Sequence, residues 1–164
     1  MKMQLVVLMI LSTLFFINCE NESEMTDNQA SKLEYEINYA SSFGMCVGPC
    51  RKKMNVVNNA LTFTVYYTEG RGAVGGTPKT YKETSDIILQ NSLSKSIDYE
   101  AFKKLKNVIG CPDCADGGAE SVEIIKGNIK HKVTFEYGKA PKEIESLVTI
   151  LREKIVYFEE KYLK

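Results

Sequence analysis

The sequence predicts a single α+β domain in which an antiparallel sheet packs against a long C-terminal helix. Three patterns support this fold class. Alternating apolar and polar residues predict half-buried strands, short turn sequences predict hairpins, and apolar residues at three- and four-residue spacing near the C-terminus predict a helix. Because strands and helices do not alternate regularly, a doubly wound parallel sheet is disfavoured. The 164 residues are enough for one domain with a hydrophobic core.

Residues 1–18 are predicted to be a signal peptide rather than part of the fold. Lys2 precedes an apolar run from Leu5 to Ile17, which is too short to cross a hydrocarbon core of about 30 Å as a helix. Asn18 and Cys19 follow it. This junction resembles the lipobox of bacterial lipoproteins, although Asn18 stands where a small residue is usual. The resemblance implies lipidation of Cys19, for example with palmitate, and attachment to the membrane through that lipid.

Residues 19–31 are polar and acidic, which predicts a solvated tether ahead of a domain at residues 32–164. The acids Glu20, Glu22 and Glu24 resemble the surface-export signals of Bacteroidota lipoproteins, but a charged tether would also explain them. The expected location is the outer membrane of the cell envelope, on its periplasmic or its outer side. Removal of the signal peptide changes the formal net charge from zero to −1, which disfavours nucleic acid as a partner.

At least four antiparallel strands are expected. The alternation predicts extended segments at residues 33–39, 54–57, 61–67, 122–125 and 129–137. Two tight turns join neighbouring segments, one at Asn58-Asn59 and one around Gly127. His131 shares its parity with the apolar residues of the last segment, so we expect it to end the buried face of that strand.

Two helices are expected beside this sheet. Asp98 is predicted to cap a helix that continues to Ile109 and stops at Gly110. The segment 87–89 is ambiguous. The last helix is predicted to begin near Pro141, and its apolar stripe should pack on the sheet.

With Cys19 assigned to the lipid, four cysteines remain in two close pairs: Cys46, Cys50, Cys111 and Cys114. An even number of cysteines in an exported chain indicates disulfides. Chain entropy is worth about 2 kcal/mol for a local bridge and about 4 kcal/mol for a bridge between the pairs. Entropy therefore favours cross-pairing while proximity favours local pairs, and all three connectivities of the four cysteines stay open at this point.

The same cysteines allow a thiol-redox or a zinc-binding role. Cys111 and Cys114 have the spacing of a redox motif, but Cys111 follows a predicted helix instead of opening one, so no helix N-terminus would activate its thiolate. Four thiolates suit zinc, but the long separation of the pairs and an oxidising compartment disfavour that site. We therefore expect no metal or other cofactor.

No catalytic residue is predicted. The single histidine, His131, is expected on the buried face of a strand, so no serine or cysteine has an identifiable histidine base to activate it as a nucleophile. The glycine-rich segment 69–79 lacks the ending of a phosphate loop, and we expect it to form a long hairpin loop. Mobile loops often carry binding residues, which makes loop glycines and the acids beside the second cysteine pair candidates for binding. These candidates are Gly72, Gly75, Gly76, Asp113 and Asp116.

The order of these segments resembles uncharacterised lipoprotein domains of Bacteroidota. The likeness rests on Phe-Gly-x-Cys-x-Gly-x-Cys at 43–50 and on Gly-Cys-Pro-Asp-Cys-Ala-Asp-Gly-Gly-Ala-Glu at 110–120, and it covers most of residues 33–160. The resemblance implies a fold and an envelope location but no reaction. We therefore expect a non-enzymatic binding or interaction module, stabilised by disulfides, whose partner is an envelope protein or a glycan. The alternative is a thiol-redox or zinc-binding envelope protein.

Overall fold

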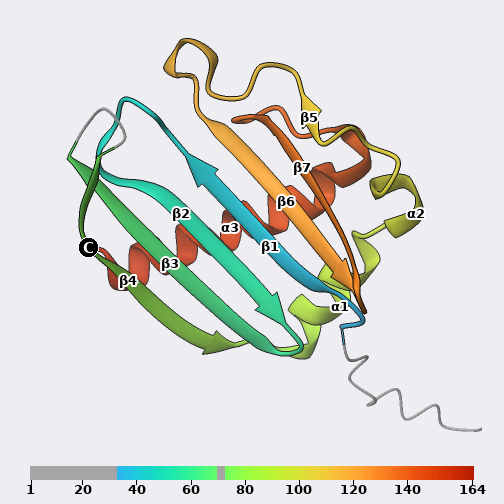
Figure 1. Ribbon diagram of the computed structural model, residues 1–164. Helices are drawn as coiled ribbons and strands as arrows, with labels where there is room; N and C mark the ends of the chain where they lie inside the picture. The colour runs from blue at the N-terminus through green and yellow to red at the C-terminus, as the bar shows by residue number, and fades with distance from the viewer. Residues whose placement is uncertain (1–32, 70–72) are drawn as a thin grey trace, which may run out of the picture.

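A computed structural model describes residues 33–69 and 73–164, and Figure 1 shows one twisted sheet with α3 running across its rear face. The architecture is broadly α+β, as the sequence predicts. Within the described residues the sheet has seven strands: β1 (Glu36–Ser42), β2 (Val47–Val57), β3 (Ala60–Glu69), β4 (Val74–Thr84), β5 (Val108–Ile109), β6 (Ala119–Lys126) and β7 (Ile129–Glu136). The helices are α1 (Ile87–Lys95), α2 (Tyr99–Phe102) and α3 (Glu145–Tyr162), with short 3₁₀ turns η1 (Cys114–Asp116) and η2 (Lys142–Ile144).

The strands lie in the order β4-β3-β2-β1-β6-β7-β5, so the first four form a meander and the β6–β7 hairpin joins it at β1. All pairs are antiparallel except the short parallel pair of β5 with β7. The turns at Asn58 and Gly127 lie where the sequence places them, and both residues have positive φ. Both hairpins are therefore confirmed.

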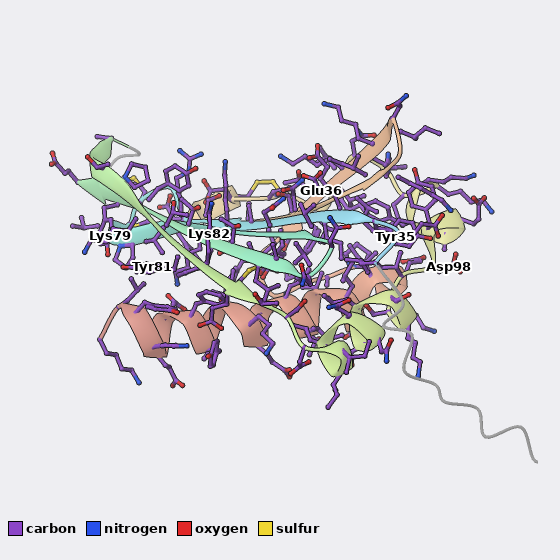
Figure 2. All side chains as sticks on the ribbon, turned by 90° about the horizontal axis from the view of Figure 1, so that it is seen from below. Tyr35, Glu36, Lys79, Tyr81, Lys82 and Asp98 are labelled. Atoms are coloured by element: carbon purple, nitrogen blue, oxygen red, sulfur yellow. A yellow bond between two sulfur atoms is a disulfide. The ribbon has the colours of Figure 1, made fainter. Side chains whose placement is uncertain are left out.

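The core lies between the sheet and α3, because alternate residues of every long strand point toward the helix. Phe63 of β3 packs against Phe158 of α3 with ring centroids 5.3 Å apart, and Tyr81 of β4 stacks on Tyr162 at 4.5 Å. Figure 2 shows the helices on one side of the sheet only. Among the described residues, no helix is long and apolar enough to cross a membrane.

The predicted helix from Asp98 to Ile109 is wrong beyond its first turn. Asp98 does cap α2, since its carboxylate accepts a hydrogen bond from Ala101 N at 2.9 Å, but α2 ends at Phe102. The following backbone satisfies the open edge of β7 instead. Thr134 N donates to Asn107 O at 2.8 Å, and the two β-branched residues Val108 and Ile109 form β5. The unpaired backbone N–H and C=O groups at a sheet edge favour a neighbouring strand, and this tertiary effect cannot be seen in the helical spacing of the sequence.

Three other boundaries differ from the expectations. The first strand begins at Glu36 rather than at residue 33 and continues to Ser42. The second begins at Val47, so it includes Cys50 and is far longer than the segment 54–57. Most of the glycine-rich segment is not a loop, because β4 starts at Val74 and pairs with β3.

The segment 87–89, which the sequence leaves ambiguous, forms the first turn of α1. The carboxylate of Asp86 caps this helix by accepting a hydrogen bond from Leu89 N at 2.7 Å.

Candidate functional site

Both cysteine pairs form local disulfides. Cys46 is joined to Cys50 with Cα atoms 5.6 Å apart, and Cys111 is joined to Cys114 with Cα atoms 5.5 Å apart. Of the connectivities that the sequence leaves open, the one favoured by proximity is present. Cys50 is buried at the start of β2, whereas Cys111 and Cys114 are both exposed.

The two disulfide loops lie side by side at one end of the sheet. Gly44 N donates a hydrogen bond to Asp113 Oδ1 at 3.3 Å, which joins the β1–β2 loop to the loop before β6. Beneath them, Phe43 packs on Tyr137 with ring centroids 4.7 Å apart. Gly118 lies so close that a Cβ there would be 2.5 Å from Phe43 Cε1. Residues 69 positions apart in the chain are thus in direct contact at this end of the sheet.

The predicted binding residues are only partly brought together. Asp113 contacts the first disulfide loop, but Asp116 is exposed and makes no hydrogen bond within the described residues. Gly75 and Gly76 belong to edge strand β4. Together with Val47 and Tyr67 they line a shallow hollow of about 660 Å³. Gly72 and the lipidation candidate Cys19 lie outside the described residues.

A second surface, which the sequence patterns do not indicate, is the sheet face opposite α3. We call it the open face, and the strand register places its side chains in straight rows across the sheet. The central row runs through residues directly opposite one another: Thr80, Thr64, Lys53, Ala40, Ser121 and Thr134. A flanking row contains Lys82, Thr62, Asn55, Asn38, Glu123 and Lys132, and the other contains Tyr66, Arg51, Ser42, Ala119 and Glu136.

The open face is hollowed over its smallest side chains. Ala40 and Ser121 form the floor of a hollow of about 300 Å³, with Lys53 and Lys132 at its sides. A neighbouring hollow of about 240 Å³ shares these four residues and extends to Arg51. Asn38 and Glu123 in one neighbouring row are longer than Ala40 and Ser121, so the centre is hollow, and short Ser42 and Ala119 in the other row let the hollow continue toward Arg51. We refer to the two hollows together as the groove.

Charge on the open face is unevenly matched. Within residues 33–69 and 73–164, the cations Arg51, Lys53 and Lys132 form no ion pair with a carboxylate. Arg51 and Lys53 instead lie over the ring of Tyr66, with Lys53 Nζ 5.1 Å from its centroid. The groove therefore presents several uncompensated ammonium and guanidinium groups.

Two acids of this face, Glu36 and Glu123, are held by side-chain amides, whereas Glu136 pairs with Lys139. Asn38 Nδ2 donates to Glu123 Oε2 at 3.2 Å, and Asn55 Nδ2 donates to Glu36 Oε1 at 3.1 Å. Asn55 also donates to Asn38 Oδ1 at 2.8 Å, which links the two contacts into one network. This network fixes Glu123 at one side of the groove, with Glu36 beyond it, and leaves the opposite side, around Arg51, basic.

A buried charge cluster under the sheet holds the floor of the groove in place. Glu120, fully buried on β6, accepts hydrogen bonds from Tyr39 Oη at 2.5 Å, from Arg152 Nε at 2.7 Å and from Gly138 N at 3.1 Å. Burial, together with the bond to Glu120, raises the pKa of Tyr39 well above its usual range. The hydrogen bond to Glu120 likewise raises the pKa of Arg152. Because Ser121 follows Glu120 directly, this cluster fixes the strand that forms the groove floor.

His131 lies on the covered face, as its parity predicts. It stands opposite Ile124, donates from Nε2 to Leu105 O at 3.0 Å and packs edge-on against Phe102. Among the described residues, no three His, Cys, Asp or Glu side chains gather in a metal-binding arrangement. No protein-family model matches the chain, and no curated protein matches it either.

Proposed function

We propose that this protein is a lipid-anchored, non-enzymatic binding module of the cell envelope that contacts its ligand through the open face. The observation that carries the proposal is the groove over Ala40 and Ser121, which lies beneath unpaired cations on a sheet face that no described helix covers. The face offers hydroxyl, amide and ammonium groups for binding. The chain's single histidine packs on the other side of the sheet.

The geometry of the domain is compatible with an anchor at Cys19. Leu33 enters at the end of the sheet that carries the β2–β3 and β6–β7 turns, where it lies beside Val57 and Gly127. The disulfide loops lie at the far end. A fully extended chain as long as residues 20–32 spans at most about 45 Å. This is longer than the sheet along its strands, since β1 is only about 24 Å long. Such a tether is long enough to keep the open face accessible above the lipid headgroups.

Membrane attachment is tested with the full chain expressed in a bacterium that processes lipoproteins. Cys19→Ser should move the protein from the membrane fraction to the soluble fraction and should abolish the acylated N-terminal peptide in a mass spectrum. A C19S variant that keeps its membrane attachment would refute the lipid anchor.

Use of the open face is tested by placing a photo-crosslinking residue at Ser121 in the groove and, as a matched control, at the exposed Lys103 that follows α2. Cells carrying the residue at 121 should give a light-dependent adduct that the control position does not give. Equal adducts, or none at 121, would contradict a ligand on this face.

A thiol-exchange role for Cys111–Cys114 is the second candidate, favoured by the exposure of both cysteines. It predicts free thiols at these positions in protein purified from the envelope under thiol-trapping conditions. A fully oxidised and metal-free mass spectrum would exclude both this role and the zinc alternative.

A further inference from the structure

The groove has the chemistry of a site for an acidic carbohydrate. We infer that its ligand is a carboxylate-bearing sugar whose acid group is bound by Lys53 and Lys132 and whose hydroxyls contact the serine and threonine side chains of the central row. This inference rests on the proposed binding role of the open face and assigns its ligand class.

Charge complementarity supports an anion. Lys53, Lys132 and Arg51 line the groove. Among the described residues of the three rows, Glu123 is the one carboxylate that lines it, and it stands directly opposite Lys132 in the strand register. Asn38 donates to that carboxylate from the neighbouring strand. The balance of three cations to one carboxylate favours a ligand with negative charge, and the rim position of the lysines leaves them accessible to it.

The floor supports a polyhydroxylated ligand rather than an apolar one. Ser121 lies on a strand between the two lysines, Thr134 lies two residues along β7 from Lys132, and Thr64 lies beside Lys53 on β3. These hydroxyls can donate or accept, which suits the hydroxyl groups of a sugar ring. The larger hollow, of about 300 Å³, is by itself at the lower end of the volume range for small-molecule sites.

A protein partner fits this face less well. Protein interfaces are centred on large apolar or aromatic anchors. The most exposed large hydrophobic residues in the described parts of the chain are Val47, Ile88, Ile129 and Met45, and none of them is in the three rows of the open face. Tyr66 is the one aromatic residue in the three rows, and two cations cover its ring. An added peptide strand would need an unpaired sheet edge, whereas the central row lies within the paired strands.

The test is isothermal titration of the full-length, lipidated protein in detergent with trigalacturonate. Binding is expected, and it should weaken about tenfold in Lys53→Gln and in Lys132→Gln, because each loses a charge-assisted contact. Lys106→Gln removes an exposed lysine away from the groove and serves as the charge-matched control, with an unchanged Kd expected. Circular dichroism of each variant confirms that it is folded.

Two further probes separate the carboxylate from the sugar. The methyl ester of trigalacturonate should bind at least tenfold more weakly, and a hexaglutamate peptide should also bind more weakly than trigalacturonate. No binding of trigalacturonate, equal binding of its ester, stronger binding of the peptide, or indifference to K53Q and K132Q would each overturn the inference. If these titrations fail while the crosslink at Ser121 persists, the acidic-sugar assignment is refuted and the proposed binding role is retained.

Discussion

Arg152 of α3 forms a bidentate contact with the carboxylate of Glu120, which is completely shielded from solvent on β6. Tyr39 from β1 donates to the same carboxylate. The cluster therefore ties the long helix to the two central strands of the sheet, at a position where a charge without partners would be costly.

Arg152→Met should destabilise the protein by about 3 kcal/mol, because it leaves the Glu120 carboxylate buried without its cation. The lower end of the range for buried pairs applies, since the Arg152 side chain is 31% exposed. Urea unfolding followed by circular dichroism measures the change. Arg51→Met, an exposed arginine on the open face, should change stability by less than about 0.5 kcal/mol. Equal effects of the two variants would show that the pair contributes no special stability.

The folded protein should lose stability as the pH rises above about 10, and part of that loss should disappear in Tyr39→Phe. The pKa of Tyr39 is raised in the folded state by burial and by its bond to Glu120. Above the unfolded pKa, the unfolded chain releases this proton while the folded chain retains it, so the free energy of unfolding falls by up to about 1.4 kcal/mol per pH unit.

The measurement is urea unfolding of both proteins between about pH 9 and pH 11.5, compared as slopes of stability against pH. The slope for Tyr39→Phe should be shallower. At neutral pH the variant should already be about 2 kcal/mol less stable, because it loses a hydrogen bond to a buried charged group. Parallel slopes would mean that Tyr39 does not ionise differently in the folded state.

Gly118→Ala should destabilise the disulfide end by about 3 kcal/mol, combining left-handed backbone strain with overpacking against Phe43. Gly118 has φ +81°, and an added Cβ would lie 2.5 Å from the Phe43 ring. Gly127→Ala is the matched control, since Gly127 also has positive φ but has open space around it. That control should cost only about 1 kcal/mol in thermal or urea unfolding. A smaller loss for Gly118 than for Gly127 would refute the close packing of the two loops.

Non-reducing peptide mapping should find Cys46 linked to Cys50 and Cys111 linked to Cys114. Replacing either pair by alanine should cost about 2 kcal/mol in chain entropy. The first pair should cost more, because Cys50 is 2% exposed and its removal also leaves a cavity. A peptide that links the two loops covalently would contradict this connectivity.

The elements best predicted from the sequence are those with strong local signals. The stripe that ends at Tyr162 forms α3, and the turns at Asn58 and Gly127 form hairpins, because their spacing or backbone preference is local. The segment after Phe102 was predicted incorrectly, since the edge of β7 provides partners that outweigh a weak helical pattern. The same holds for the glycine-rich segment, which β3 converts into an edge strand.

The candidate site was largely beyond prediction. The cysteines and Asp113 could be singled out by residue type, and the structure does bring both loops to one end of the sheet. The groove could not be predicted, because Ala40, Ser121, Lys53 and Lys132 come from four strands and none has a distinctive motif. The alternation does show that each strand has a polar face, but which polar residues become neighbours depends on the strand order.

Local periodicity and residue chemistry are enough to predict the broad α+β class, the two tight turns, the long C-terminal helix and the cysteines available for bridging. The strand order, the pairing of Glu120 with Arg152 and the row that joins Lys53 to Ala40 and Ser121 are visible only in the folded molecule. Those relationships join residues far apart in the chain. They arise from the register of paired strands and from the burial of a charge that must find its partner, and neither is encoded in a short stretch of sequence.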